Sequence, residues 1–325
     1  MSSSVLTAFP IDDLDSPALP IFWRRGSSSG GHFLVQKITI ISNRTAGRGR
    51  AERRARALEH LLREAGLSLS SHATESADEA RGIARSAVAE GCECLVIAGG
   101  DGSLLNLLDL IAGTHTALAV LPTGRGNDFS RGVGLASSCA RLARSIVEEQ
   151  TRYVDLGCVN GTLFGTVAGC GLDAEVGRLT AGGSTWGGTA GYLTQALKSI
   201  RTFRGFSMRI QVDGIVVHEG DTTLVACANT STYGGGFRIA PGADPTDGKL
   251  DVCVVRRVKR IEALGLLPQL ALGNHLGHPS VRFFHASEVR IDSPEPLTTM
   301  ADGEVIGTVP MKVTVKPQAL RVVHP

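Results

Sequence analysis

The sequence contains no long hydrophobic run, because no apolar stretch approaches the ~18 residues of a membrane-spanning helix. The net charge is also low, at +2 over 325 residues, so charge gives no support for a nucleic-acid partner. The first 20 residues lack the positive start of a signal peptide and are interrupted by acidic residues and prolines. These absences predict a cytoplasmic protein with no transmembrane segment, whose contact with a membrane is at most peripheral.

The seven cysteines show neither a disulfide pattern nor a metal pattern. They are odd in number and mostly lie inside apolar stretches, which predicts buried, reduced thiols in a reducing cytoplasm. Cys92 and Cys94 alternate as residues of a strand do, and no second pair completes a zinc site.

Three common active-site motifs are absent as well. The Gly248-Lys249 pair has Ala243 where a Walker loop needs its first glycine, and Gly47-x-Gly49 is followed by Glu52 where a Rossmann fingerprint needs its third. The Gly-x-Ser-x-Gly turn of serine hydrolases does not occur. Interpretations as a dehydrogenase or a hydrolase therefore lose support.

What the first half of the chain does contain is an alternation of buried strands and amphipathic helices. Strands are predicted at "ITIIS", "LSLSSHAT", "CLVIAG" and "ALAVLP", and helices at "RAERRARALEHLLREAG", "ADEARGIARSAVAEG" and "LLNLLDLIAG". This order predicts an α/β domain with a parallel sheet and crossover helices, whose ligand crevice lies beyond the carboxyl ends of the strands.

From about residue 152 the pattern changes to short alternating strands with Asn-Gly and Asp-Gly turns, which predicts a mainly antiparallel β domain. One helix, around "GYLTQALKSIRTF", interrupts these strands. The predicted organisation is a flexible tail over 1–35, a nucleotide-binding α/β domain over 36–151 and a β-rich acceptor domain over 152–315. Whether residues 316–325 return to the first domain is left open.

Two glycine-flanked acidic loops end strands of the first domain, "GGDG" and "LPTGRGNDF". Glycines allow backbone N–H groups to face an anion closely, and a carboxylate beside a phosphate calls for a bridging cation. Asp101 is therefore a candidate for holding Mg²⁺, although Asp101 and Asp128 could each be an ordinary turn or cap residue.

Four motifs together resemble the bacterial diacylglycerol kinase family of soluble lipid kinases: "GGDGS", "LPTGRGNDFSRGVGL", "YGGGFRIAPGADPTDGKLDV" and "DGE" at 302–304. Their order and spacing hold from about residue 37 to 325. The third motif is the most discriminating, since NAD kinases and 6-phosphofructokinases share only the acidic glycine loop. The resemblance implies a fold similar to that of diacylglycerol kinases and NAD kinases.

The resemblance also implies transfer of the γ-phosphate of ATP, with Mg²⁺, to a lipid hydroxyl. The implied ATP-binding residues are Asn43, Gly47, Thr74, Gly99, Gly100, Asp101, Gly102, Ser103, Leu104, Leu105, Gly124, Arg125, Asn127 and Asp128. Asp244, Asp247 and Lys249 match a structural Mg²⁺ site, which taken alone would be a solvated turn. The implied catalytic residues are Asp101, Asp302 and Glu304; Glu304 is the favoured base and Asp302 its partner, unless "DGE" is merely a hairpin tip.

Three positions depart from the family pattern. Leu105 and Asn106 replace an amide and a carboxylate, and Arg125 replaces a threonine.

Diacylglycerol is the expected acceptor, with a ceramide or sphingoid base as the alternative. A soluble-substrate kinase of the NAD kinase type and a non-catalytic nucleotide or lipid sensor remain further hypotheses. The segments "YLTQALKSI" and "ALGLLPQLALG" are candidate walls of an acyl-chain cleft or plain core helices, and a homodimer is left open.

Overall fold

The computed structural model describes residues 37–44, 46–124, 126–135, 138–172, 174 and 205–324. Three predicted features lie outside these residues: the tail over 1–35, the helix around 191–203, which includes "YLTQALKSI", and Arg125.

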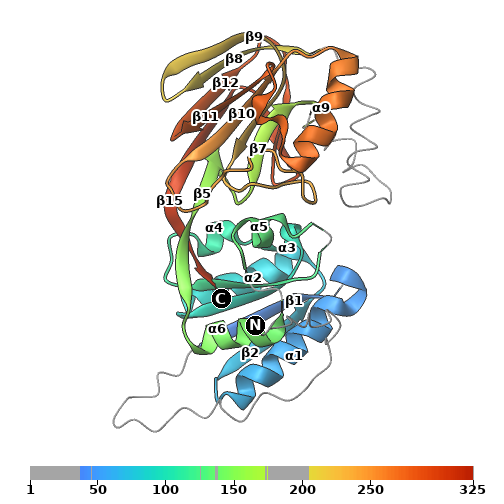
Figure 1. Ribbon diagram of the computed structural model, residues 1–325. Helices are drawn as coiled ribbons and strands as arrows, with labels where there is room; N and C mark the ends of the chain where they lie inside the picture. The colour runs from blue at the N-terminus through green and yellow to red at the C-terminus, as the bar shows by residue number, and fades with distance from the viewer. Residues whose placement is uncertain are drawn as a thin grey trace, which may run out of the picture. The chain divides into compact units, whose positions relative to one another are not determined.

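The first half of the described chain forms a parallel sheet in the order β2-β1-β3-β4. Its strands are β1 (Ile38–Asn43), β2 (Leu69–Thr74), β3 (Cys94–Gly99) and β4 (Ala117–Pro122). Because β2 lies on one side of β1 and β3 on the other, the chain reverses its direction of growth between β1 and β3 (Figure 1). Such a switch point is where open α/β sheets bind ligands.

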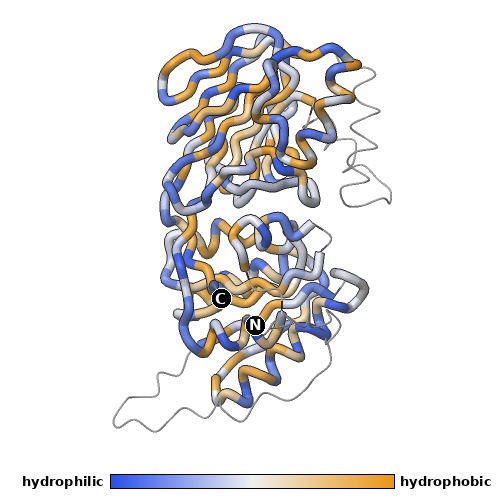
Figure 2. Tube along the Cα trace, in the orientation of Figure 1, coloured by the Kyte–Doolittle hydropathy of each residue, from blue (hydrophilic) through white to orange (hydrophobic). Residues whose placement is uncertain are grey.

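Helices cover both faces of this sheet because successive strand residues point to opposite sides. On one face, α1 (Arg50–Glu64) and α6 (Cys139–Val147) pack on residues such as Ile40 and Val96. On the other, α2 (Ala77–Ala89) and α4 (Leu108–Ile111) pack on residues such as Ile41 and Ile97. The strands at the centre of this sheet are accordingly mostly orange in the hydropathy colouring of Figure 2.

The helix predicted over "LLNLLDLIAG" is wrong as a single element. The structure instead has α3 (Asp101–Leu105), which starts at the acidic loop itself, and then α4. Between them, the Asn106 side chain donates to the carbonyl of Gly102 at 2.9 Å, so it competes for a backbone acceptor of the helix.

The second half is mainly antiparallel, as predicted. Its strands are β5 (Thr151–Val159), β6 (Thr162–Phe164), β7 (Val167–Gly171), β8 (Phe206–Val212), β9 (Ile215–Ala228), β10 (Leu250–Arg256), β11 (Val281–Ala286), β12 (Glu288–Asp292), β13 (Thr298–Ala301), β14 (Glu304–Thr308) and β15 (Met311–Val323). β11 and β13 were not predicted. The long β15 pairs with β12 and β5, and its Val322 lies opposite Leu118 of β4 in the parallel sheet.

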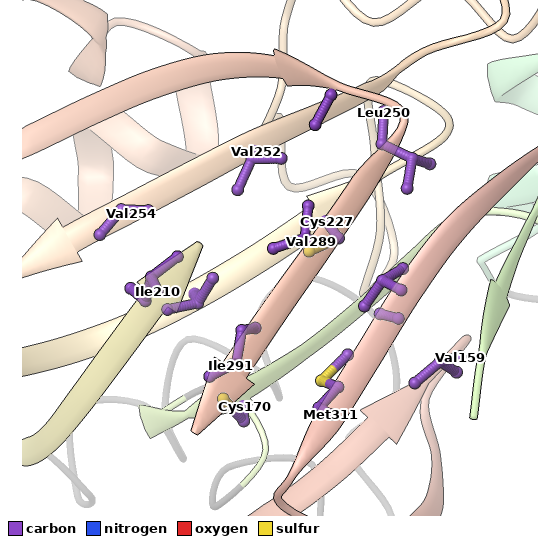
Figure 3. Close-up of a cluster of buried hydrophobic side chains, with 14 of the residues drawn as sticks. Val159, Cys170, Ile210, Cys227, Leu250, Val252, Val254, Val289, Ile291 and Met311 are labelled. Atoms are coloured by element: carbon purple, nitrogen blue, oxygen red, sulfur yellow. The ribbon is translucent and has the colours of Figure 1, made fainter. Parts of the chain in front are cut away.

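Apolar side chains from several of these strands form one core. Figure 3 shows its centre, where Ile210, Val252 and Ile291 come together from β8, β10 and β12. A second cluster lies under helix α9 (Arg260–Leu272), which packs Leu266 and Leu270 against the sheet. In the part of the chain that the structure describes, no helix is both long and apolar enough to cross a membrane. All seven cysteines are free thiols.

Candidate active site

A pocket of about 400 Å³ opens at the carboxyl ends of β1 and β3, at the switch point of the parallel sheet. Ile41, Ala80, Ile97 and Leu107 give it an apolar wall. Most of its polar rim comes from the predicted nucleotide-binding set, and the members that line it are Asn43, Gly47, Thr74, Gly100, Gly102, Ser103 and Gly124. The pocket thus brings together predicted residues from the carboxyl ends of four strands.

Other members of that set lie elsewhere. The Leu104 side chain is fully buried in the core and Leu105 packs against the same cluster, and neither is among the residues that line the pocket. Asn127 instead shapes the second loop: its Oδ1 accepts from Gly124 N–H at 3.0 Å and its amide donates to Gly124 O at 2.8 Å.

The two glycine loops approach each other backbone to backbone. A Cβ on Gly124 would lie 2.8 Å from the Cα of Gly100, closer than real Cβ contacts allow. Only glycine fits at position 124, and a Cβ on Gly100 would lie 3.2 Å from the Cα of Gly124, tighter than most real contacts.

Asp101 and Asp128 converge next to these loops. A Cβ on Gly126 would lie 3.0 Å from Oδ2 of Asp101 and 3.2 Å from Oδ2 of Asp128, so both carboxylates reach the same spot. Asp101 Oδ1 accepts from Phe129 N–H at 3.3 Å, and Asp128 Oδ2 accepts from Gly235 N–H at 2.7 Å. Gly235 belongs to the "YGGGF" motif, so that motif is tied to the second loop.

The surroundings of this pair suit a cation. Burial raises the pKa of the Asp128 carboxyl, the Gly235 amide lowers it, and the charge of Asp101 raises it again. Asp128 Oδ1 is buried without a hydrogen-bond partner, and the Arg131 guanidinium is 3.8 Å away. Mg²⁺ is commonly held by one or two carboxylates together with substrate phosphates. The pair therefore fits the predicted Mg²⁺, whereas the described residues contain no cluster of three or more His, Cys, Asp or Glu that could hold a metal ion.

Asp302 occupies the tip of the β13–β14 hairpin. Asp302 and Gly303 both have positive φ, at 50° and 86°, as the two central residues of a tight hairpin turn require. The Asp302 carboxylate accepts from Gly165 N–H at 2.6 Å, from Thr166 N–H at 2.7 Å and from the Thr166 hydroxyl. Burial raises its pKa to about 6 even though these donors act in the opposite direction. Glu304, two residues on, is exposed to solvent.

Phe129 and Gly165 join the two acidic positions. Phe129 N–H binds Asp101, and its ring lies against Gly165, where a Cβ would be only 2.5 Å from Phe129 Cδ2. Gly165 N–H in turn binds Asp302. A chain of contacts therefore runs from the acidic glycine loop of the first sheet to the "DGE" hairpin.

The third motif forms a compact acidic turn. Asp244 Oδ1 accepts from Thr246 N–H at 3.0 Å, Asp247 Oδ1 accepts from Lys249 N–H at 2.9 Å, and Lys249 Nζ donates to Ser287 Oγ at 2.7 Å. These bonds are those of an ordinary turn. Burial raises the pKa of the nearby Asp251, and the charges of Asp247 and Asp244 raise it further. The turn thus concentrates negative charge, and a structural Mg²⁺ there stays a prediction.

Sequence analysis missed two buried polar residues that connect these parts. Asp155, fully buried in β5, accepts from Gly248 N–H and from Gln318 N–H, each at 2.7 Å. Asn229 donates to the carbonyls of Asp155 and Gly165, each at 2.9 Å. A lone acid inside an apolar strand was the available signal, since a buried charge must be compensated by hydrogen bonds.

Two family models match the chain, one after the other. The "Diacylglycerol kinase catalytic domain" matches residues 37–159, and the "YegS C-terminal NAD kinase beta sandwich-like domain" matches residues 166–324. A Diacylglycerol kinase of Mycobacterium tuberculosis is 32% identical over 298 residues, which are 90% of this chain and 96% of that protein. The chain belongs to the diacylglycerol kinase family. The predicted family and class of enzyme, a lipid kinase, are thereby confirmed.

Other members of the diacylglycerol kinase family and its structural neighbours agree. A Diacylglycerol kinase of Staphylococcus carnosus is 28% identical, over 85% of this chain and 90% of its own. The crystal structure of a diacylglycerol kinase from Bacillus anthracis superposes with a TM-score of 0.68 at 20% identity, covering 89% of this chain and 97% of its own. Yeast NADH kinase reaches a TM-score of 0.50 at 11% identity, covering 89% and 83%. These structures confirm the predicted fold class.

Proposed function

We propose that this chain transfers the γ-phosphate of ATP, with Mg²⁺, to the hydroxyl of diacylglycerol. The observation that carries the proposal is the continuous connection from Asp101 through Phe129 and Gly165 to Asp302. It joins a nucleotide-sized pocket to a partly buried carboxylate that could serve an acceptor hydroxyl. The choice of acceptor is supported by the relatives named diacylglycerol kinase.

The proposed nucleotide position follows from the chemistry of the pocket. Its apolar wall of Ile41, Ala80 and Ile97 suits a flat purine base, while the glycines on its other side leave room for phosphates. Asp101 and Asp128 are the residues that would hold Mg²⁺. When bound there, the ion would offset the negative charge that these carboxylates present to the phosphates.

For the acceptor side, we propose that Asp302 takes the proton of the lipid hydroxyl. Its carboxylate is fixed by Gly165 and Thr166, and its Oδ2 can accept a further hydrogen bond, from the lipid hydroxyl. A pKa of about 6 is close to the working range of a general base at neutral pH. Glu304 is exposed and would be solvated. This assignment reverses the order of preference suggested by the sequence alone.

The rate of transfer is expected to fall as the pH is lowered through about 6, because protonated Asp302 can no longer accept the proton. Acid unfolding driven by this group does not explain such a loss. Its raised pKa means that the folded protein binds the proton more tightly than the unfolded chain, so its stabilising contribution is present below pH ~4 and is lost as the pH rises through about 6. The dependence of kcat/KM on pH, measured from pH 5 to 8, checks this prediction. The Glu304→Gln variant should show the same fall in kcat/KM at low pH.

The acceptor is tested with γ-labelled ATP, Mg²⁺ and mixed micelles that contain diacylglycerol, ceramide or sphingosine, with NAD offered separately. Labelled diacylglycerol is expected, with each other acceptor at least about tenfold slower, a difference of ~1.4 kcal/mol in the barrier. If ceramide or sphingosine were labelled in preference, the protein would still be a lipid kinase, but diacylglycerol would not be its acceptor. Labelling of NAD without any lipid product would contradict the proposal.

We also propose the domain limits expected from the sequence, 36–151 and 152–315. The two family models also divide the chain into two parts, but their boundary lies at 159 to 166, so β5 falls in the first of them. The contact of Val322 with Leu118 supports the return of the last residues to the parallel sheet.

A further inference from the structure

We propose that the outer face of α9 docks on an anionic lipid bilayer. The inference rests on the proposed function, since it names the surface from which the lipid acceptor would be taken. We call this surface the α9 face and define it as Ile261, Leu264 and Leu272 of α9, together with Leu276 of the following turn η3 (His275–Gly277).

Large aliphatic side chains on the α9 face are exposed to solvent. Ile261 is 80% exposed, Leu264 47%, Leu272 67% and Leu276 50%. Among the described side chains of α9, the other exposed positions are Gly265 and Pro268, so no charge interrupts the stripe. A surface helix ordinarily turns charged residues outward, and exposed apolar patches on this scale mark interaction sites.

The exposure is not caused by a loosely attached helix. The opposite face of α9 buries Leu266 and Leu270 in one cluster with Leu224 and Val255 of the sheet. Figure 1 shows α9 beside the strands of the second half. One face is therefore already in a core, and the apolar character of the other face needs a different partner.

Positive charges flank the α9 face. Lys259 is exposed immediately before the helix. At its other end the exposed Arg238 lies beside Gly273, where a Cβ would be 3.3 Å from Arg238 Cβ. Glu262 is occupied elsewhere: its carboxylate accepts from Lys259 N–H at 3.2 Å and from Ser280 Oγ at 3.1 Å.

An apolar stripe between cations suits anionic lipid headgroups over a hydrocarbon layer, which is the pattern of helices that lie in a membrane interface. A second copy of the chain suits it less well. Pairing two α9 faces in either direction would place Lys259 or Arg238 of one copy near a cation of the other.

The α9 face is also connected to the acidic site. Val167 belongs to the apolar cluster beneath α9, and it directly follows Thr166, whose N–H and hydroxyl hold Asp302. The sheet beneath the α9 face thus also leads to Thr166, the residue that holds the proposed base Asp302.

Binding is measured by co-sedimentation with vesicles, in the absence of ATP, using the full chain. The test variant is Leu264→Glu/Leu272→Glu. The matched control is Ile215→Glu/Val216→Glu, which adds the same charge at an equally exposed aliphatic pair on β9. On vesicles of equal parts phosphatidylglycerol and phosphatidylcholine, the α9 variant is expected to bind at least about tenfold more weakly than wild type and control, a change of ~1.4 kcal/mol. Wild type, the α9 variant and the control should all bind weakly to vesicles of pure phosphatidylcholine.

A second assay separates docking from catalysis. Relative to wild type, transfer to a short-chain diacylglycerol, present as monomers, should fall much less in the α9 variant than transfer to vesicle-borne diacylglycerol. If the α9 variant binds phosphatidylglycerol vesicles as wild type does, the proposal is wrong. The proposal would also be wrong if light scattering showed wild type as a dimer and the α9 variant as a monomer, because a second copy of the chain would then cover the α9 face. If wild type phosphorylated no lipid but still bound vesicles through the α9 face, the proposed function would be refuted and the docking surface would remain supported.

Discussion

Replacement of Asp302 by Asn is expected to lower kcat for lipid phosphorylation by about 10²- to 10⁴-fold, the usual contribution of a general base. The amide cannot take the acceptor proton. Its NH₂ group would also replace an oxygen that accepts the N–H of Gly165 or Thr166, so a modest loss of stability is expected. Steady-state transfer rates and a thermal unfolding curve, measured on the same preparation, separate the two effects.

Glu304 supplies the control for this prediction, because it lies two residues away and is exposed. Glu304→Gln is expected to change kcat by less than about tenfold, since a solvated carboxylate is a weaker candidate for proton transfer. A large loss in Glu304→Gln together with near-normal turnover in Asp302→Asn would move the role of base to Glu304.

Asp101→Asn is expected to lower transfer by roughly 10³-fold, about 4 kcal/mol in the barrier, with the fold intact. The substitution removes one of the two carboxylates that converge on Gly126, so Mg²⁺ affinity should fall and part of the rate should return at high Mg²⁺. Loss of the Asp101 charge should also lower the pKa of Asp128, because that charge helps to raise it. A Mg²⁺ titration of the transfer rate measures the main effect.

Asp78→Asn is the control for Asp101→Asn. Asp78 is an exposed carboxylate in the first turn of α2, so its loss removes the same charge without touching the paired carboxylates. Transfer within about tenfold of wild type in Asp101→Asn, or an equal loss in Asp78→Asn, would remove Asp101 from the site.

The sequence predicted the parts of this molecule that depend on local pattern. Four parallel strands, the antiparallel second half and the glycine loops follow from apolar periodicity and turn residues. β11 and β13 were not predicted, and the helix over "LLNLLDLIAG" was overextended because Asn106 bonds back to the main chain. The buried side of α9 was expected, but its exposed side was not, since an all-apolar segment does not show which face is covered.

The connections within the site could not be predicted in the same way. Asp302 is 136 residues from Thr166 and Asp128 is 107 residues from Gly235, so these contacts exist only once the sheets are assembled. Phe129 joins the two halves as a ring packed on Gly165, a role that nothing in its local sequence marks. The motifs therefore predicted a set of site residues, and the structure shows which of them lie in contact.

The most direct test of the central claim, that one site joins the nucleotide pocket to Asp302 and phosphorylates a lipid hydroxyl, is the stoichiometry of a single reaction. ADP and phosphorylated lipid are measured together, with ATP, Mg²⁺ and diacylglycerol-containing vesicles. The account predicts one phosphorylated diacylglycerol for each ADP, with both products lost in Asp302→Asn. ADP release without phosphorylated lipid, or undiminished lipid product in Asp302→Asn, would contradict it.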